Sequence, residues 1–322
     1  MDEWLVADQS EVVDTNPPGV GFSHEALFYA GEEEFLAGTL PFIRDGLAND
    51  EPILVAVADH KITLLTQQLG EKAERVRFAN MAELGQNPAR IIPAWREFAT
   101  EGPSLRGIGE PAWPGRSEPE FCECDYHESL LNLAFADAED FRLLCPYDVA
   151  GLSAPVLDAA RRNHPLVTCD GERLESGTYV APELAPGPFS GTLPPPASEP
   201  EALEFGAGGL GAVRRFVWER AHAFELPPAR QADLVTAVNE LTGNSIRHGG
   251  GACAVKVWSE ERALFVEVSN SGSLHDPLMG RERPDPLQLS GRGVWIVNQL
   301  CDLVQIRSDA DRTAVRVRMA LN

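Results

Sequence analysis

The chain has 322 residues, 43% hydrophobic and 24% charged, which is ordinary for a globular protein and long enough for two domains with separate cores. Its formal net charge of −22 argues against direct binding to DNA, because affinity for phosphate backbones comes mainly from Lys and Arg, and favours protein partners with basic surfaces. No apolar run reaches the roughly 20 residues that span a bilayer, and the N-terminus is acidic where a signal peptide would be basic, so we expect a cytoplasmic protein without a membrane segment.

Residues 1–20 are acidic and end in Asn-Pro-Pro-Gly, which predicts a flexible tail before ordered structure begins near Phe22. From there to about residue 180, short apolar segments alternate with amphipathic ones. Residues 53–57 (ILVAV) are typical of a strand covered on both faces, and residues 35–47 carry apolar side chains at helical spacing. The alternation predicts an α/β domain with a mostly parallel sheet over residues 21–180.

The first strand–helix turn of this domain, at Ala30 and Gly31, is a common place for a nucleotide in α/β folds. It has no glycine-rich phosphate-binding motif, and three glutamates follow it at positions 32–34. Carboxylates at a helix N-terminus suit the helix dipole but would repel a phosphate. We therefore do not expect this domain to hydrolyse nucleotides.

Six cysteines are scattered along the chain without a C-x-x-C pair, so we expect them to be reduced and mostly buried. Cys122, Cys124 and His127 could hold a metal or form a thiol sensor, although their spacing matches no familiar zinc pattern and a fourth ligand would have to come from elsewhere. The alternative is packed cysteines beside a hydrogen-bonded histidine. Three aromatic residues are either ordinary core residues or the lining of an apolar ligand pocket: Trp95, Trp113 and Tyr126.

Residues 181–202 are rich in Pro with Gly and Ser, which predicts a semi-rigid linker. Over residues 203–322 the expected elements follow the order helix, helix, hairpin, loop, helix, hairpin. This order predicts an α+β sandwich with helices on one face of an antiparallel sheet.

The second of these helices carries a pair of polar residues that suits a metal–phosphate site. Leu234, Val238 and Leu241 recur on one apolar face, while Glu240 and Asn244 share a different face about one turn apart. A carboxylate can take a proton, and an amide oxygen is a hard ligand of the kind that Mg²⁺ prefers. The alternative is two solvated residues on an outer face.

Residues from about 205 to 322 resemble the GHKL ATPase domain, in the branch of anti-sigma-factor serine kinases that control bacterial partner switching. Residues 240–249 (ELTGNSIRHG) resemble the N box of the family, residues 268–272 (VSNSG) its D-x-G box, and residues 291–297 (GRGVWIV) its G-x-G-x-x-[IL] box. The resemblance implies a sandwich of the GHKL (Bergerat) type that binds ATP and Mg²⁺. Domains of this branch often form homodimers.

By this resemblance, Asn244 would ligate a Mg²⁺ that bridges the ATP phosphates, and Glu240 would orient or deprotonate the attacking hydroxyl. Backbone N–H groups beside the glycines that open the last helix would approach phosphate. His248 matches a position that the family often fills with His, or it serves as a helix-terminal cap. The further cofactor-binding positions that the boxes imply are Asn270, Gly272, Gly291, Arg292, Gly293 and Thr313.

The sequence departs from the family pattern at the end of the site that recognises the base. The adenine-reading Asp is Asn270 here, Leu274 replaces the second Gly of the D-x-G-x-G pattern, and Arg312 stands where a Gly usually precedes Thr313. The NH₂ group of an Asn would need a new acceptor, and an unpaired polar group in the pocket costs about 1–3 kcal/mol, one to two decades of affinity. Weak or lost ATP binding would leave a binding module without kinase activity.

Residues from about 22 to 180 resemble the MEDS (methanogen/methylotroph, DcmR-type sensory) domain. The resemblance rests on residues 24–29 (HEALFY), 127–132 (HESLLN) and 144–148 (LCPYD). It implies a RecA-like α/β fold without a working P-loop, and a role in sensing small molecules.

Two functional hypotheses follow. In the first, the chain is an anti-sigma factor that binds a sigma factor, uses ATP to phosphorylate a Ser of a STAS-type anti-anti-sigma protein, and is modulated by its N-terminal sensory domain. In the second, it is a non-catalytic sensor and adaptor whose degenerate ATP site only supports partner binding. A histidine kinase is disfavoured because no phosphoacceptor His on a long dimerisation helix precedes the ATPase-like domain.

Overall fold

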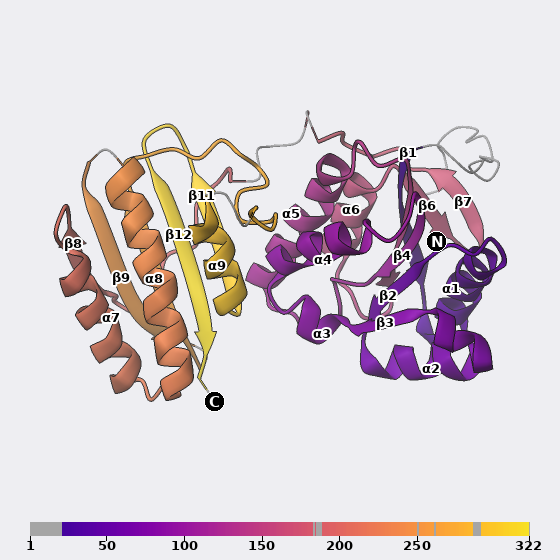
Figure 1. Ribbon diagram of the computed structural model, residues 1–322, viewed down its shortest axis with the longest axis horizontal. Helices are drawn as coiled ribbons and strands as arrows, with labels where there is room; N and C mark the ends of the chain where they lie inside the picture. The colour runs from indigo at the N-terminus through magenta and orange to yellow at the C-terminus, as the bar shows by residue number, and fades with distance from the viewer. Residues whose placement is uncertain are drawn as a thin grey trace, which may run out of the picture. The chain divides into compact units, whose positions relative to one another are not determined.

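The computed structural model describes residues 21–182, 184, 189–249, 251–260, 262–285 and 291–321, and the chain separates into two compact units (Figure 1). The first unit contains the described residues up to Leu84 and from Glu97 to residue 184. The second contains residues 85–96 and the described residues from Phe189 onward. The tail predicted at residues 1–20 and several residues of the predicted linker lie outside the described residues.

The first unit is built on a seven-stranded sheet of order β3-β2-β4-β5-β1-β6-β7. All neighbouring strands are parallel except β6 and β7, which form an antiparallel hairpin that the sequence did not predict. The mostly parallel sheet predicted for this half is confirmed. Its strands are β1 (Gly21–Tyr29), β2 (Ile53–Val57), β3 (Arg77–Asn80), β4 (Ser104–Gly109), β5 (Asp140–Asp148), β6 (Leu166–Cys169) and β7 (Glu172–Glu175).

Helices cover both faces of this sheet because its strands alternate between two buried sets of side chains. Leu27, Val55 and Ile108 pack with the apolar residues of α1 and α2 in one core. Side chains of β1 and β5 on the opposite face, among them His24 and Cys145, meet residues of α5 and α6. The helices of the unit are α1 (Gly31–Ala48), α2 (Asp59–Leu69), α3 (Met81–Leu84), α5 (Glu118–Ala134), α6 (Ala154–Asn163) and the 3₁₀ helix η1 (Gly70–Arg75).

At the turn between β1 and α1, the chain uses its own carboxylate where a nucleotide-binding fold would place a phosphate. Gly31 adopts a φ of +78°, and the backbone N–H of Ala30 donates to Glu34 Oε2 at 2.7 Å. A side-chain carboxylate therefore takes the N–H group that an anion would otherwise approach at this helix start.

The second unit is a five-stranded antiparallel sheet of order β11-β12-β10-β9-β8, with α7, α8 and α9 on one face (Figure 1). Valines of the sheet and the apolar faces of the helices form one core. The α+β sandwich predicted for this half is confirmed, and β8 is an addition to it. The elements are α7 (Leu210–Ala223), α8 (Pro228–His248), α9 (Arg292–Leu300), β8 (Glu201–Phe205), β9 (Cys253–Glu260), β10 (Ala263–Asn270), β11 (Leu303–Ser308) and β12 (Thr313–Ala320).

Residues 85–96 of this unit contain the 3₁₀ helix η2 (Pro88–Arg90) and the first residues of α4 (Ile91–Phe98). The Arg90 guanidinium donates to the backbone oxygens of Asn298 and Gln299 at 2.8 and 2.9 Å, and to Cys301 O at 2.8 Å. A cation on these last carbonyls complements the negative end of the α9 dipole. Within the described ranges, no helix of either unit is long and apolar enough to cross a membrane.

Candidate functional site

Helix α8 places the polar pair recognised in the sequence. It begins with Pro228 at its first position and buries Leu234, Val238 and Leu241 against the sheet. Glu240 and Asn244 are half-buried on the side that faces the start of α9. The helix thus presents the amide of Asn244 to a cavity and the carboxylate of Glu240 to the start of α9, and neither lies on an outer solvated face.

That cavity has a volume of about 320 Å³ and opens between α8, β10, β12 and the start of α9. It is within the range of small-molecule sites, which begins near 300 Å³. Glu240 and Arg292 do not line it, and the exposed Arg292 guanidinium donates to Asp285 O at 3.1 Å. The sequence-predicted residues that do line it are Asn244, Asn270, Gly272, Gly291, Gly293 and Thr313, together with His248 and Leu274.

The start of α9 approaches α8 closely because it lacks side chains. Gly291 caps the helix with a φ of +88°, a conformation that favours glycine. A Cβ atom on Gly293 would lie 2.9 Å from Asn244 Nδ2 and 3.2 Å from Glu240 Oε2. Glu240 therefore sits beside the helix start although it does not line the cavity. An N-terminus of this kind, open to a cavity, is a favourable place for a phosphate group.

Asn244 carries the amide oxygen that a metal ion would use. In the structure Arg247, three residues further along α8, donates to Asn244 Oδ1 at 2.7 Å. Arg247 is exposed. A hard cation at Asn244 would therefore have to displace a flexible side chain, which would then be available to pair with a phosphate.

Both polar atoms of the Asn270 side chain have hydrogen-bond partners, which the sequence did not predict. Its Nδ2 donates to Ser245 Oγ at 3.0 Å, and its Oδ1 accepts from the backbone N–H of Gly272 at 2.8 Å. Ser245, one residue after Asn244 and on the buried side of α8, is the acceptor that sequence reasoning missed. In this arrangement the Asn270 NH₂ group is paired, so the free-energy cost expected for an unpaired NH₂ group is absent.

Thr313 closes the same end of the cavity. The register of β10 and β12 pairs it with Asn270, and its hydroxyl donates to Gly272 O at 2.7 Å. The hydroxyl of Ser308 lies 2.8 Å from that of Thr313 and accepts from the N–H of Leu274 at 2.8 Å. The Leu274 side chain packs against the apolar core. This residue therefore holds the beginning of the loop after β10 through both its backbone N–H and its side chain.

The Cys122, Cys124 and His127 set does not form a metal site. Cys124 is buried and its thiol donates to Pro111 O at 3.3 Å, while burial raises the pKa of this thiol to about 12. In the part of the chain that the structure describes, the metal-ligating side chains that converge are instead His24, Glu128, Cys145 and His164.

The comparisons with known proteins agree with this architecture. Residues 206–319 match the model of the histidine kinase-like ATPase domain, and residues 23–165 match that of the MEDS (MEthanogen/methylotroph, DcmR Sensory) domain. The second unit is therefore an ATPase-like domain of the class that binds ATP. The chain therefore joins an N-terminal region that matches the MEDS sensory domain to a C-terminal region that matches the histidine kinase-like ATPase domain.

No curated protein matches the chain. Among solved structures, the RsbU and RsbW domains of Rv1364c from Mycobacterium tuberculosis match at 14% identity and a TM-score of 0.31, over 65% of this chain and 49% of that one. The chain thus spans about half the length of that structure. The histidine kinase AdeS of Acinetobacter baumannii matches at 13% identity and a TM-score of 0.25, over 39% of this chain and 70% of that one.

Proposed function

We propose that the chain is an anti-sigma factor with serine kinase activity, whose second unit binds ATP with Mg²⁺ and phosphorylates a Ser of a STAS-type anti-anti-sigma protein. The observation that carries the proposal is the gathering of Asn244, Asn270 and Gly293, from three separate sequence blocks, around one cavity of about 320 Å³. The match to the histidine kinase-like ATPase domain supports it.

Each residue has a role that its position supports. Asn244 Oδ1 would hold Mg²⁺ after Arg247 turns away, and the N–H groups at the start of α9 would bind phosphate. Asn270 and Thr313 would contact the base from the other end of the cavity. Glu240, beside the helix start, would orient or deprotonate the attacking Ser hydroxyl. When bound, Mg²⁺ supplies charge neutralisation for phosphoryl transfer.

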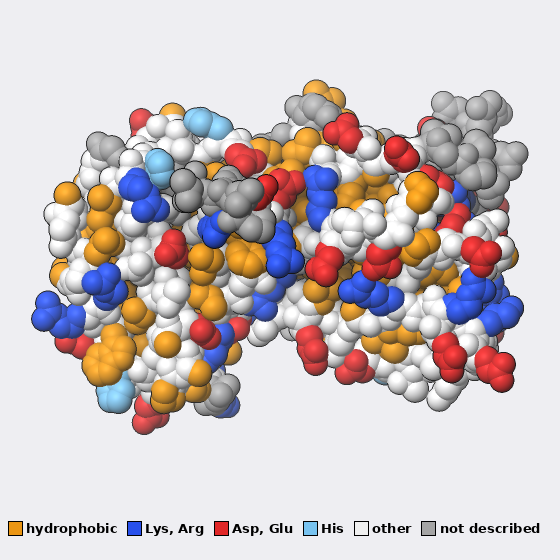
Figure 2. All heavy atoms as spheres, viewed as in Figure 1, with side chains coloured by type: hydrophobic (Ala, Val, Ile, Leu, Met, Phe, Trp, Pro, Cys, Tyr) orange, Lys and Arg blue, Asp and Glu red, His pale blue; other side chains and the backbone are white. Residues whose placement is uncertain are grey.

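The partners belong to the same proposal. The net charge of −22 suits a basic, DNA-binding partner such as a sigma factor. On the face in Figure 2, acidic, basic and apolar side chains of the described residues are interspersed, without the continuous basic surface that a nucleic acid would need. The MEDS domain would modulate the switch in response to a small molecule.

A non-catalytic adaptor is the second candidate, and two hydrogen bonds favour it. Arg247 occupies Asn244 Oδ1, and the Gly272 N–H occupies Asn270 Oδ1. Both oxygens would otherwise face metal and base. A domain that keeps these bonds would bind protein partners without nucleotide.

Phosphoryl transfer from labelled ATP to a purified STAS partner separates the two candidates. We expect the full chain to label one Ser of the partner, and Glu240→Gln to lower the rate at least a hundredfold, within the range that general-base catalysis contributes. Glu219→Gln, an exposed change on α7, is the matched control and should label at the wild-type rate. No labelling by the wild-type chain, with sigma binding retained, would establish the adaptor.

A further inference from the structure

Four ligand-type side chains that the proposed kinase reaction does not use meet inside the first unit. His24 comes from β1, Glu128 from α5, Cys145 from β5, and His164 directly follows α6. Their exposed fractions are 0%, 2%, 1% and 0%. Three of them belong to the blocks 24–29, 127–132 and 144–148, so the first block meets two others that lie more than a hundred residues further along the chain.

The distances between their ligand atoms match a coordination shell. His24 Nε2 lies 3.0 Å from Glu128 Oε2 and 3.4 Å from Cys145 Sγ, and His164 Nε2 lies 3.4 Å from Glu128 Oε2. All four atoms lie within 4.8 Å of one another. A tetrahedral shell with bonds of about 2.0–2.3 Å has edges of about 3.3–3.6 Å. The three edges given by these distances therefore differ from that range by only a few tenths of an ångström, and separations that approach 4.8 Å would shorten when an ion binds.

Hydrogen bonds outside the cluster orient both imidazoles for metal binding. His164 Nδ1 lies 2.7 Å from Ala160 O, and His24 Nδ1 lies 3.1 Å from Asn132 Oδ1. The Asn132 amide is itself fixed, because its Nδ2 donates to Asn163 O at 2.8 Å. Since both oxygens can only accept, each Nδ1 carries the hydrogen and each Nε2 turns its lone pair into the cluster. Metal-binding histidines are held in the same way.

Without a cation, the centre of the cluster brings hydrogen-bond acceptors together: the Nε2 atoms of both histidines and the Glu128 carboxylate. Glu128 Oε1 and His164 Nε2 are buried and have no hydrogen-bond partner. Unsatisfied buried acceptors are costly, and a single proton would pair only two acceptors of the cluster. A divalent cation would pair all the ligand atoms at once. Together with the carboxylate and a thiolate, its two positive charges would make the buried site neutral.

We propose that His24, Glu128, Cys145 and His164 form a four-coordinate site for Zn²⁺ or a chemically similar divalent transition ion. Two imidazoles, a thiolate and a carboxylate suit borderline ions of this class, whereas Mg²⁺ and Ca²⁺ prefer oxygen ligands. Binding breaks the S–H bond of Cys145, forms a metal–sulfur bond and releases the proton to solvent. The site lies in the first unit and does not depend on nucleotide binding in the second.

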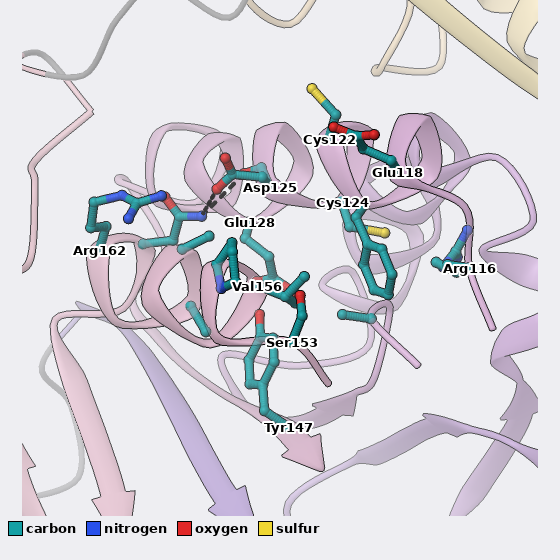
Figure 3. A pocket seen from close by; sticks show the side chains of 16 residues that line it. Arg116, Glu118, Cys122, Cys124, Asp125, Glu128, Tyr147, Ser153, Val156 and Arg162 are labelled. Atoms are coloured by element: carbon teal, nitrogen blue, oxygen red, sulfur yellow. Dashed lines mark hydrogen bonds between the residues drawn. The ribbon is translucent and has the colours of Figure 1, made fainter. Parts of the chain in front are cut away.

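The site borders a cavity that a small molecule could enter. The cavity has a volume of about 610 Å³, and Glu128, Tyr147 and Asn163 line it (Figure 3). Trp95, Trp113 and Tyr126, which the sequence offered as possible pocket lining, are not among the described residues that line this cavity. Phe121 and Val156 supply apolar lining instead. Glu128 is the one residue shared by the cluster and the cavity, which puts the metal within one side chain of a ligand pocket.

The test uses the full chain, stripped with a chelator and then titrated with Co²⁺ alone. We expect a single Co²⁺ per chain, the visible bands of four-coordinate Co²⁺ and a thiolate-to-metal charge-transfer band, all lost when Zn²⁺ is added. Cys145→Ser should lose the charge-transfer band. Cys124→Ser is the matched control, because Cys124 is also a buried cysteine and lies beside the site, in the lining of the neighbouring cavity, but outside the cluster; it should keep the band.

A folded wild-type chain that binds neither Co²⁺ nor Zn²⁺ at micromolar concentration would overturn the proposal. So would a charge-transfer band that survives in Cys145→Ser. If that variant does not fold, X-ray absorption at the zinc edge of the wild-type chain decides instead. One sulfur at about 2.3 Å with nitrogen and oxygen at about 2.0 Å supports the site, and a shell without sulfur contradicts it.

Discussion

The start of α9 approaches α8 closely at Gly293, and Gly293→Ala is the change that tests whether phosphate binds there. This glycine is the second residue of α9, and the substitution adds one methyl group toward Asn244 and Glu240. Its φ is not positive, so the backbone itself accepts an alanine without strain.

The magnitude follows from the contact distances. The new Cβ atom would lie 2.9 Å from Asn244 Nδ2, where an ordinary contact is about 3.5–4.0 Å, so the amide must retreat by at least about 0.6 Å. Overpacking of this kind costs about 1–3 kcal/mol, and alanine recovers up to about 1 kcal/mol in helix propensity. We therefore expect a small change in unfolding free energy but a loss of roughly tenfold to a hundredfold in MgATP affinity, at 1.4 kcal/mol per decade.

Isothermal titration of the full chain with MgATP measures the effect. Gly211→Ala is the matched control, because Gly211 is also the second residue of a helix, α7, and its Cβ would meet nothing within 4 Å. That variant should keep wild-type affinity. If Gly293→Ala binds MgATP as tightly as the wild type, phosphate does not bind beside Asn244 and the reasoning is wrong.

For three further substitutions, the structure determines whether stability or MgATP affinity rises or falls. Lys61→Met should lower the unfolding free energy by about 3–5 kcal/mol at pH 7, because it leaves the buried Glu110 carboxylate without its cation. Adding Glu110→Gln to this variant should restore most of the lost stability, and an unchanged loss in the double variant would contradict this. Burial raises the pKa of Glu110, so the deficit of the single variant should shrink as the pH falls. Burial also raises the pKa of Cys301 from 9.0 to about 12, so between these pH values the folded chain keeps a proton that the unfolded chain loses, and this thiol alone should lower the stability to urea by about 1.4 kcal/mol per pH unit. Cys301→Ala should make the slope of stability against pH shallower by that amount, and an equal slope would refute the assignment. Asn270→Asp should tighten MgATP binding about tenfold, because the carboxylate can accept from the base while the Ser245 hydroxyl donates to it; unchanged affinity would place the base elsewhere.

Strands and helices of both units could be predicted where their apolar residues form a continuous run or recur at regular spacing. The ILVAV run of β2 is buried at every position, and the apolar face of α8 packs as its spacing indicated. β8 was missed because its residues 201–205 (EALEF) are mostly exposed and follow a proline-rich stretch. Such a strand exists only because β9 supplies its hydrogen bonds, which a local pattern does not contain.

The cavity itself could be foreseen from motif blocks, but its internal contacts could not. The pairing of Asn270 with Ser245 depends on where the end of β10 meets α8, 25 residues away in sequence. The metal-ligand cluster was hidden for the same reason. Cys122 and Cys124 are close in sequence and therefore suggested a metal site. The ligand-type residues that do converge, such as His24 and Cys145, are distant in sequence and are brought together by the pairing of β1 with β5.

We expect the second unit to bind MgATP through Asn244, and calorimetric titration of MgATP into the full chain tests this binding most directly. The decisive variant is Asn244→Ala. Its matched control is Asn239→Ala on the same helix, whose side-chain oxygen accepts from Arg214 at 2.9 Å and not from Arg247. We expect saturable binding by the wild type and by Asn239→Ala, and a loss of at least tenfold in Asn244→Ala. No heat with the wild-type chain at millimolar MgATP, or equal binding by all three proteins, would contradict the claim.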